Sequence, residues 1–527
     1  MIKNFFLNLS RHRILILIIL VAIALRLVLV LKGGQFFLPD ENRFKVGYQW
    51  IMLMRHGYHQ FATILFFRTF AHPLYLVASV IIQFLLYFIL KPFYPSMNID
   101  TGFIFFKQGV YAAAFIFSLF SVVCIFLVYK ISRRMGAEKR EGLIAAFLMA
   151  CSTSMFYYSR HIQPYDLSIV FALFSIWLGI KKKTALWMSF VCGLMSGVSL
   201  MVYYGYCILI LVSLYFHVFA EAQTLLRRIS KALVFCTGAV FIPLVINAFS
   251  LKLINQNFLI GVRNFSTTVL LGDYAEGWSP PWEYLWHIEH FILLLWASAL
   301  IFIVGRRFLS KEPSAVLSRA IKFTVAVGMV YVILFVVCDV MHRFVIYGRT
   351  VRQMVPFFCL LTASAAEILL NAFQKLKVYL ISFLISIVII QAAFNSYIPF
   401  IQRFPKDIQE EVKKKYGPVF QFKTLNEVRF DSASPIISED SNLFSRYVLL
   451  NADLFYRVLG RTPFPLPAGK VLFQERHPFE YLPYQYEEFI PSERKLLRQN
   501  NISMRLIEYR STVIYLTTSK NIFEEFN

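Results

Sequence analysis

Two adjacent carboxylates, Asp40 and Glu41, follow the first long apolar stretch of the chain in the sequence LPDENRF. A carboxylate held where water is scarce can act as a general base toward a hydroxyl on a sugar or phosphate acceptor. Pro39 suits the alternative interpretation equally well, which is a solvated turn after an apolar helix. Residue types and spacing leave both interpretations open.

A second charged segment is YYSRHIQPYD, in which Arg160 and Asp166 lie between two apolar stretches. Ionisable side chains at such positions in a membrane protein are candidates for function. The alternative is an ion pair between Arg160 and Asp166 that caps the two flanking helices. The sequence favours neither reading over the other.

Three cations, Arg343, Arg349 and Arg352, occur together in MHRFVIYGRTVRQMVP. A guanidinium can bind a phosphate through two parallel hydrogen bonds, so this cluster suits an anionic lipid headgroup. The alternative is that these side chains merely extend toward the headgroup layer. Arg26 lies inside the first apolar stretch, and we expect it to face the interior of a helix bundle.

Two aromatic-rich segments complete the candidates. In AHPLY, His72 precedes Pro73 at the start of an apolar helix, where the helix dipole favours a phosphate, although a lone histidine is more often structural. In GWSPPWEYLWHIEH, Trp278 and Trp282 could stack on a sugar or belong to an interfacial aromatic belt.

Several common functional motifs are missing from the sequence. No Walker A, GxGxxG, GxSxG or HExxH pattern occurs, which argues against ATP-driven transport, nucleotide-dependent chemistry, serine hydrolases and zincin-type metal sites. All seven cysteines lie in apolar stretches without CxxC spacing, so we expect them to be small core residues.

Composition indicates a membrane protein. Of 527 residues, 58% are hydrophobic and 16% are charged, against about 45–50% apolar and about 25% charged in soluble domains. The net charge of +23 would suggest nucleic acid in a soluble protein. Here the positive charge is better explained by lysine and arginine residues that orient the chain in the membrane, and we expect no nucleic-acid partner.

Apolar stretches long enough for membrane helices recur along the first three quarters of the chain. The expected spans are 14–31, 110–129, 142–159, 165–180, two within 185–219 broken near Tyr203, 232–250, 285–305, 320–339, 353–371 and 378–395. The stretch 74–91 is also apolar enough to cross.

Lysine and arginine clusters mark the cytoplasmic ends of spans. Such clusters occur within 1–13, 130–140, 181–183, 227–231, 306–322 and 375–377. Placing all of them inside makes 74–91 a re-entrant or juxtamembrane helix within an outer loop, 32–109. It gives eleven crossings with the N-terminus cytoplasmic. The competing topology, in which 74–91 crosses the membrane, puts two of these clusters on the extracytoplasmic side.

The chain changes character after residue 395. The tail 396–527 carries charge runs, several prolines and β-rich pieces such as RYVLL, GKVLF and STVIYLTT. We therefore expect a transmembrane domain at 1–395 and a small extracytoplasmic α/β domain at 396–527.

One span, an outer-face DE pair and HPLY opening an apolar helix together resemble the start of polytopic GT-C glycosyltransferases. The closest branch is the protein mannosyltransferase and aminoarabinose transferase superfamily. The segments GLIAAFLMACSTSMFYYSRHIQPYDLSIVFALFSIWL and HRFVIYGRTVRQMVPFFCLLTASAA are similar to its middle and late spans. The resemblance covers roughly 1–395 and implies a GT-C-like fold.

The resemblance also implies roles for individual residues. Asp40 would be the base or orient the acceptor beside Glu41, and Asp166 would line the same cavity. Asp40 and Asp166 would then be the ligands if a divalent metal takes part; no other cofactor is implied. In aminoarabinose transferases a lysine contacts the donor phosphate. The corresponding position here is His72, so Arg349 and Arg352 become the stronger candidates for that contact.

The expected function is transfer of a sugar from a polyprenyl-phosphate donor to a glycan, lipid or protein acceptor on the extracytoplasmic side, by single displacement with inversion. We expect the location to be a bacterial inner (plasma) membrane. The rival is a transporter or flippase of a lipid-linked sugar, which should show inverted repeats or broken helices near the midplane. A non-catalytic scaffold is the third option, disfavoured by the presence of Asp40 and Asp166.

Overall fold

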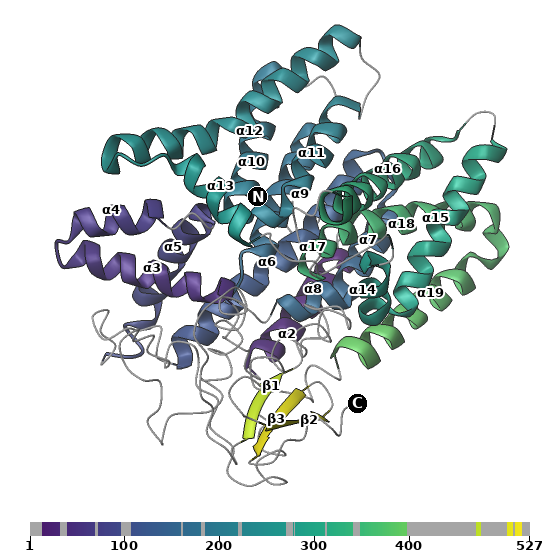
Figure 1. Ribbon diagram of the computed structural model, residues 1–527. Coiled ribbons are helices and arrows are strands. Elements are labelled where there is room, and N and C mark those ends of the chain that lie inside the picture. The colour runs from purple at the N-terminus through teal and green to yellow at the C-terminus, as the bar shows by residue number, and fades with distance from the viewer. Residues whose placement is uncertain are drawn as a thin grey trace.

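The computed structural model describes most of the chain before residue 398 and three short segments after it. The described ranges are 13–31, 39–68, 72–95, 107–159, 162–180, 185–219, 224–269, 278, 280–310, 313–340, 348–397, 471–475, 503–509 and 512–518. Apart from the last three, these segments are almost entirely helical (Figure 1).

Eight of the described helices are long and apolar enough to cross a membrane. They are α2 (Arg13–Leu31), α5 (Pro73–Leu90), α6 (Lys107–Arg134), α12 (Leu225–Ile254), α15 (Phe291–Leu309), α16 (Ala315–Phe335), α18 (Val355–Ala372) and α19 (Lys377–Ala392). Three shorter apolar helices accompany them: α9 (Tyr165–Gly179), α10 (Leu186–Val202) and α11 (Ile208–Phe219). The chain is thus an integral membrane protein, as its composition predicts.

Shorter elements connect these helices. They are α3 (Pro39–Arg55), α4 (His59–Arg68), α7 (Lys139–Cys151), α8 (Thr153–Tyr158), α13 (Phe258–Val269), α14 (Pro280–Glu289) and α17 (Gly348–Val351). Single 3₁₀ turns are η3 (Tyr204–Tyr206), η5 (Arg352–Met354) and η6 (Gln374–Leu376), and π turns are η4 (Val336–Val340) and η7 (Ala393–Tyr397).

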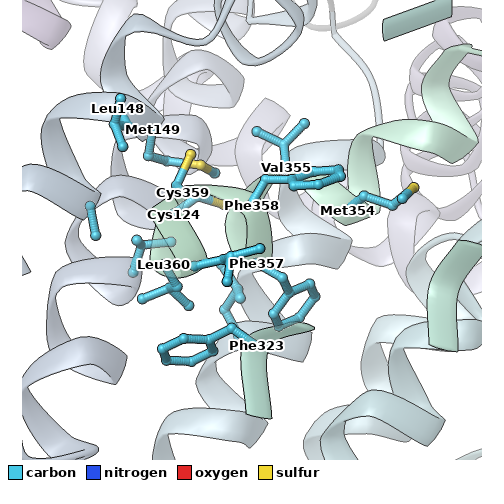
Figure 2. Close-up of a cluster of buried hydrophobic side chains, with 14 of the residues drawn as sticks. Cys124, Leu148, Met149, Phe323, Met354, Val355, Phe357, Phe358, Cys359 and Leu360 are labelled. Atoms are coloured by element: carbon cyan, nitrogen blue, oxygen red, sulfur yellow. The ribbon is translucent and has the colours of Figure 1, made fainter. Parts of the chain in front are cut away.

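The helices form two groups around a central layer (Figure 1). Helices α10, α11 and α12 lie on one side and α15, α16, α18 and α19 on the other, with α6, α7 and α9 between them. The first part of α18 is buried throughout, because it packs against α7, α16 and α15. Figure 2 shows Phe357, Phe358 and Cys359 of this helix among side chains from α6, α7 and α16.

Ion pairs join helices at the end of the bundle where the lysine and arginine clusters lie. Arg319 donates to Glu141 at 2.6 Å, and Ser364 donates to the same carboxylate at 2.6 Å. Arg140 donates through Nε to Glu367 at 2.8 Å. Two of the clusters predicted to be cytoplasmic, 130–140 and 306–322, therefore meet at one end of the bundle.

Irregular backbone interrupts the helices within three of the predicted spans. The predicted break within 185–219 is confirmed, since α10 ends at Val202 and η3 follows before α11. The prediction of one continuous helix over 142–159 is wrong, because extended backbone at Ser152 separates α7 from α8. The predicted span 285–305 is also divided, at His290, whose φ of 42° cannot continue a helix.

Within the segment predicted to be the first outer loop, the described residues form the three helices α3, α4 and α5, which pack on the bundle. Gln83 of α5 donates to the carbonyl of Phe44 in α3 at 2.7 Å, and Tyr75 of α5 donates to the carbonyl of Ile162 at 2.7 Å. Helix α5 is thereby tied both to the helix that begins with the DE pair and to the segment just before Asp166. Its 18 residues are enough to cross the membrane, so its re-entrant placement stays a prediction.

The described part of the tail is a three-stranded antiparallel sheet in the order β1-β3-β2. The strands are β1 (Val471–Glu475), β2 (Ser503–Tyr509) and β3 (Thr512–Thr518), with Phe473 opposite Ile514 and Ile507 opposite Ile514 on its other side. The predicted pieces GKVLF and STVIYLTT contribute β1 and β3, whereas RYVLL lies outside the described residues.

The cysteines only partly follow the prediction. Cys124, Cys151, Cys192 and Cys359 are buried, but Cys207 and Cys236 are exposed; Cys338 lies in η4, and its side chain is outside the described part of the structure. Periodicity was too weak to distinguish a core position from a lipid-facing one, because both environments are apolar.

Glycines allow the backbones of α10 and α12 to approach each other closely. A Cβ atom added at Gly193 would lie 2.0 Å from the carbonyl oxygen of Phe235, and one at Gly197 would lie 2.5 Å from that of Ala239. On the opposite helix, a Cβ at Gly238 would lie 2.3 Å from the carbonyl oxygen of Phe190. Small residues four apart let membrane helices approach this closely.

This contact predicts an asymmetric response to added methyl groups. Gly193→Ala should destabilise the protein by about 1–3 kcal/mol, because the new methyl group overlaps backbone atoms that cannot move independently. Gly328→Ala, at a helical glycine with nothing within 4 Å of the added Cβ, is the matched control and should be neutral or stabilising. Unfolding midpoints in detergent measure both; equal midpoints would contradict the packing argument.

The topology can be tested by labelling single cysteines introduced at exposed positions on either side of α5. With Cys207 and Cys236 replaced by serine, we expect Gln60→Cys and Pro95→Cys to react with an impermeant thiol reagent from the extracytoplasmic side. Glu138→Cys, beside the 130–140 cluster, should react only from the cytoplasmic side. Labelling of positions 60 and 95 from opposite sides would show that α5 crosses.

Candidate active site

An ion pair between Asp166 and Arg352 lies at the centre of the candidate site. Asp166 occupies the first turn of α9 and is 6% exposed, whereas Arg352 begins η5 and is completely buried. The Arg352 Nη2 atom donates to Asp166 Oδ1 at 2.5 Å. Asp166 is thus paired with a residue 186 positions away, and Arg160, the partner considered from the sequence, lies outside the described residues.

The surroundings of Arg352 come from α8. The guanidinium carbon lies 4.4 Å from the centre of the Tyr158 ring, and Nη2 lies 3.4 Å from the sulfur of Met155. Among the described residues, its Nε and Nη1 atoms have no hydrogen-bond partner. A buried guanidinium held by one carboxylate and one aromatic face can be displaced only at a high cost, so its position is tightly defined.

A ladder of aromatic rings leads from Arg352 to His72. The Tyr158 ring is 5.6 Å from Tyr165, Tyr165 is 4.7 Å from Tyr203, and Tyr203 is 4.8 Å from His72, measured between ring centres. The structure therefore brings His72 of the first outer loop into one cluster with Asp166 and Arg352, three of the residues singled out from the sequence.

The part of this ladder formed by His72 and Tyr203 depends on unusual backbone. His72 has a φ of 62° and precedes Pro73 at the first position of α5, and the backbone N–H of Tyr204 donates to its Nδ1 at 3.4 Å. Tyr203 is extended between α10 and η3, and its ring covers Gly205, where a Cβ would lie only 2.4 Å from it. The Tyr-Tyr-Gly sequence thus breaks the helix and turns Tyr203 into the cluster.

Arg26 faces the interior of the bundle, as predicted. It is completely buried, donates to Ser121 Oγ at 2.5 Å and to the carbonyl of Ala22 at 3.2 Å, and lies 5.8 Å from the centre of the Phe156 ring. Because Ser121 and Cys124 are one turn apart on α6, and Cys124 contacts the Asp166 carbonyl at 3.8 Å, Arg26 lies close to the site.

Sequence reasoning missed Glu289, the last residue of α14, as a site-building residue. Its buried carboxylate accepts hydrogen bonds from Ser152 Oγ at 2.6 Å, the Thr153 N–H at 2.9 Å, and the N–H and Oγ of Ser154 at 3.0 and 2.8 Å. These donors lie at the break between α7 and α8, which explains why 142–159 is not one helix. The available signal was an acidic residue within the apolar run 285–305.

The DE pair lies at the start of a helix. Asp40 and Glu41 are the second and third residues of α3, with Pro39 at the first position, which proline favours. Their side chains, and that of Arg349 in α17, are outside the described part of the structure, as is Arg343 altogether. Whether Asp40 and Asp166 share a cavity therefore stays a prediction.

The two tryptophans pack against α16 and α18. Trp278 stacks on Phe335 at 3.5 Å between ring centres and remains 52% exposed. Trp282 contacts Tyr331 at 5.4 Å and Phe358 at 5.9 Å. These contacts hold α14 against the bundle and leave the exposed face of Trp278 for either lipid or a sugar.

The residues that the structure describes contain no group of three histidine, cysteine, aspartate or glutamate side chains that could hold a metal ion. The Asp166 carboxylate is engaged by a guanidinium, which competes with a cation for the same oxygen atoms. The paired carboxylate of Asp166 therefore does not fit a divalent ion, and the reaction proposed for this protein does not use one.

Comparison with known proteins agrees with the resemblance inferred from the sequence. The profile of the dolichyl-phosphate-mannose-protein mannosyltransferase family matches residues 91–247, a region that includes Asp166. This match confirms the resemblance to the GT-C glycosyltransferases. No curated protein matches the chain.

The solved structures that match this chain include the archaeal oligosaccharyltransferase AglB from Archaeoglobus fulgidus, in complex with an inhibitory peptide and a dolichol-phosphate. The identity is 11% and the TM-score 0.41, over 81% of this chain and 62% of AglB. The present chain thus spans less than two thirds of the length of that protein.

The buried pair makes a prediction about stability. Asp166→Asn or Arg352→Gln alone should destabilise the protein by about 3–5 kcal/mol, because each leaves one buried charge without its partner. The double variant should lose less than the sum of the two, since it leaves neither charge. Chemical unfolding in detergent measures all three. Arg13→Gln, at the exposed start of α2, is the control, and additive losses would mean that the two residues act independently.

Proposed function

We propose that this protein is a membrane glycosyltransferase that transfers a sugar from a polyprenyl-phosphate donor to an acceptor on the extracytoplasmic side. The acceptor is a glycan, a lipid or a protein. We further propose a transmembrane domain at 1–395 with eleven crossings and a re-entrant α5, an extracytoplasmic α/β domain at 396–527, and a bacterial inner membrane with the N-terminus in the cytoplasm.

One observation carries this proposal: Asp166, which lies within the segment 91–247 that matches the mannosyltransferase profile, is buried in an ion pair with Arg352. Around it, α5, α8, α9 and η3 converge through the aromatic ladder from His72 to Tyr158. Buried charge is expensive within a membrane and is retained where it serves a function. A lipid phosphate as leaving group also explains why no nucleotide-binding motif is needed.

The candidate residues have different roles in the proposed reaction. Asp40, at the start of α3, is the base that takes the proton from the acceptor hydroxyl, with Glu41 beside it. Asp166 faces the same cavity and is held in place by Arg352, whose complete burial favours a positioning role over a surface phosphate contact. Arg349, one turn earlier in α17, is then the better candidate for the donor phosphate, together with His72, Arg160 and Arg343.

The reaction follows from these positions. The acceptor oxygen attacks the anomeric carbon as its proton passes to Asp40, and the bond to the phosphate oxygen breaks. Cationic side chains stabilise the phosphate that departs on its lipid anchor. A single displacement inverts the configuration at the anomeric carbon. Trp278 and Trp282 would border the acceptor side of this cavity through α14.

The rival function, movement of a lipid-linked sugar between leaflets, gains some support from the broken helices α7–α8 and α10–α11. The ion pairs of Glu141 with Arg319 and of Arg140 with Glu367 join helices at the end of the bundle that we propose to be cytoplasmic. A transport cycle would have to open these contacts, whereas transfer on the outer side leaves them intact.

The test measures transfer of a labelled sugar from a polyprenyl-phosphate donor in proteoliposomes. Asp40→Asn should reduce the rate by about 10²–10⁴-fold with donor binding retained, because the amide cannot accept the proton. Arg349→Ala should instead weaken donor binding, with partial recovery in Arg349→Lys, which keeps the charge but loses the planar fork.

Glu41→Gln is the matched control for Asp40→Asn and should have the milder effect. Activity of Asp40→Asn within about threefold of the parent, far from the expected loss of a general base, would contradict the assigned role. A parent protein that transfers no sugar from any donor, but moves the lipid between leaflets, would establish the transporter instead.

A further inference from the structure

We infer that Glu289 is a positioning residue for the reaction: its carboxylate fixes the start of α8, and α8 in turn fixes Arg352 beside Asp166. This inference rests on the proposed function, which it deepens by naming a residue outside the cavity on which the geometry of Asp166 depends.

The first step is the contact between Glu289 and the helix break. The carboxylate receives four hydrogen bonds, two from the backbone N–H groups of Thr153 and Ser154 and two from the hydroxyls of Ser152 and Ser154. Those N–H groups are the first two of α8 and have no partner within their own helix. Glu289 therefore acts as the N-terminal cap of a helix more than 130 residues away in sequence, where a negative charge also suits the helix dipole.

The second step is what α8 carries. Three of its six residues contact two completely buried arginines: Met155 and Tyr158 lie against Arg352, and Phe156 lies against Arg26. A six-residue helix has too few internal hydrogen bonds to define its own position. The cap fixes the start of the helix, while the ring contacts of Phe156 with Tyr397 and of Tyr158 with Tyr165 hold its side chains further along.

The third step links Glu289 to α19 and, through α14, to α17. Its backbone carbonyl accepts from Gln391 of α19 at 2.9 Å, and the next residue, His290, has φ 42° and ψ −112°, so α14 ends there abruptly. Helix α14 also packs on α17, the helix of Arg349, and carries Trp282. Glu289 therefore connects the helix that borders the cavity with the residues that hold Asp166.

The experiment compares Glu289→Gln with Glu141→Gln. Both glutamates are completely buried and accept from serine hydroxyls, but Glu141 pairs with Arg319 at the cytoplasmic end and touches nothing in α8. We expect both variants to lose thermal stability. Only Glu289→Gln should lower kcat, by at least about tenfold, the scale of a small misplacement of a catalytic group, with the acceptor KM within twofold of the parent. Glu289→Asp should recover part of the rate.

A second readout does not depend on activity. Hydrogen–deuterium exchange of a peptide covering 152–158 should accelerate in Glu289→Gln and stay unchanged in Glu141→Gln. Ser154→Ala, which keeps the backbone bonds, should show a smaller effect and serves if Glu289→Gln does not fold.

The outcomes separate the two proposals. An active parent with equal kcat in Glu289→Gln and Glu141→Gln, or unchanged exchange at 152–158, overturns the positioning role alone. A parent that transfers no sugar overturns the proposed function and the catalytic consequence assigned to Glu289 with it, and the exchange measurement then reports only on the cap.

Discussion

Burying a carboxylate and a guanidinium together, at Asp166 and Arg352, is the constraint around which the rest of the structure is arranged. Neither charge is tolerable alone in an apolar interior, and the pair is stable only if the surrounding atoms fix its geometry. The ring of Tyr158, the sulfur of Met155 and the thiol of Cys124 all lie against the two residues. Four helical segments must therefore meet at this point.

Bringing those segments together requires helices that do not run straight through. Irregular backbone within a membrane is tolerated only where the protein satisfies its freed polar groups. At Ser152 the carboxylate of Glu289 does this, and at Tyr203 the turn η3 and the ring of His72 do so. The two breaks lie beside the charged pair because they supply the side chains that surround it.

The sequence was sufficient to predict the membrane-spanning character, most helix positions and the break at Tyr203, because these follow from local hydropathy and from the Tyr-Tyr-Gly sequence. It also pointed to Asp166, Arg352 and His72 as unusual residues in apolar surroundings. The pairing of Asp166 with Arg352 could not be predicted, because 186 residues separate them and the nearer Arg160 was an equally plausible partner from the sequence.

The break at Ser152 could not be predicted for a related reason. Ser-Thr-Ser is compatible with a continuous membrane helix, and nothing local to residues 151–154 interrupts it. The interruption comes from Glu289, which offers the backbone N–H groups better partners than the preceding turn would. Tertiary contacts of this kind leave no periodic trace in a single sequence.

The glycine contact between α10 and α12 has a mechanical consequence. Because Gly193, Gly197 and Gly238 bring backbone against backbone, the two helices cannot slide or separate by a fraction of a turn without collision. The wall of the site that ends in Tyr203 is therefore rigid.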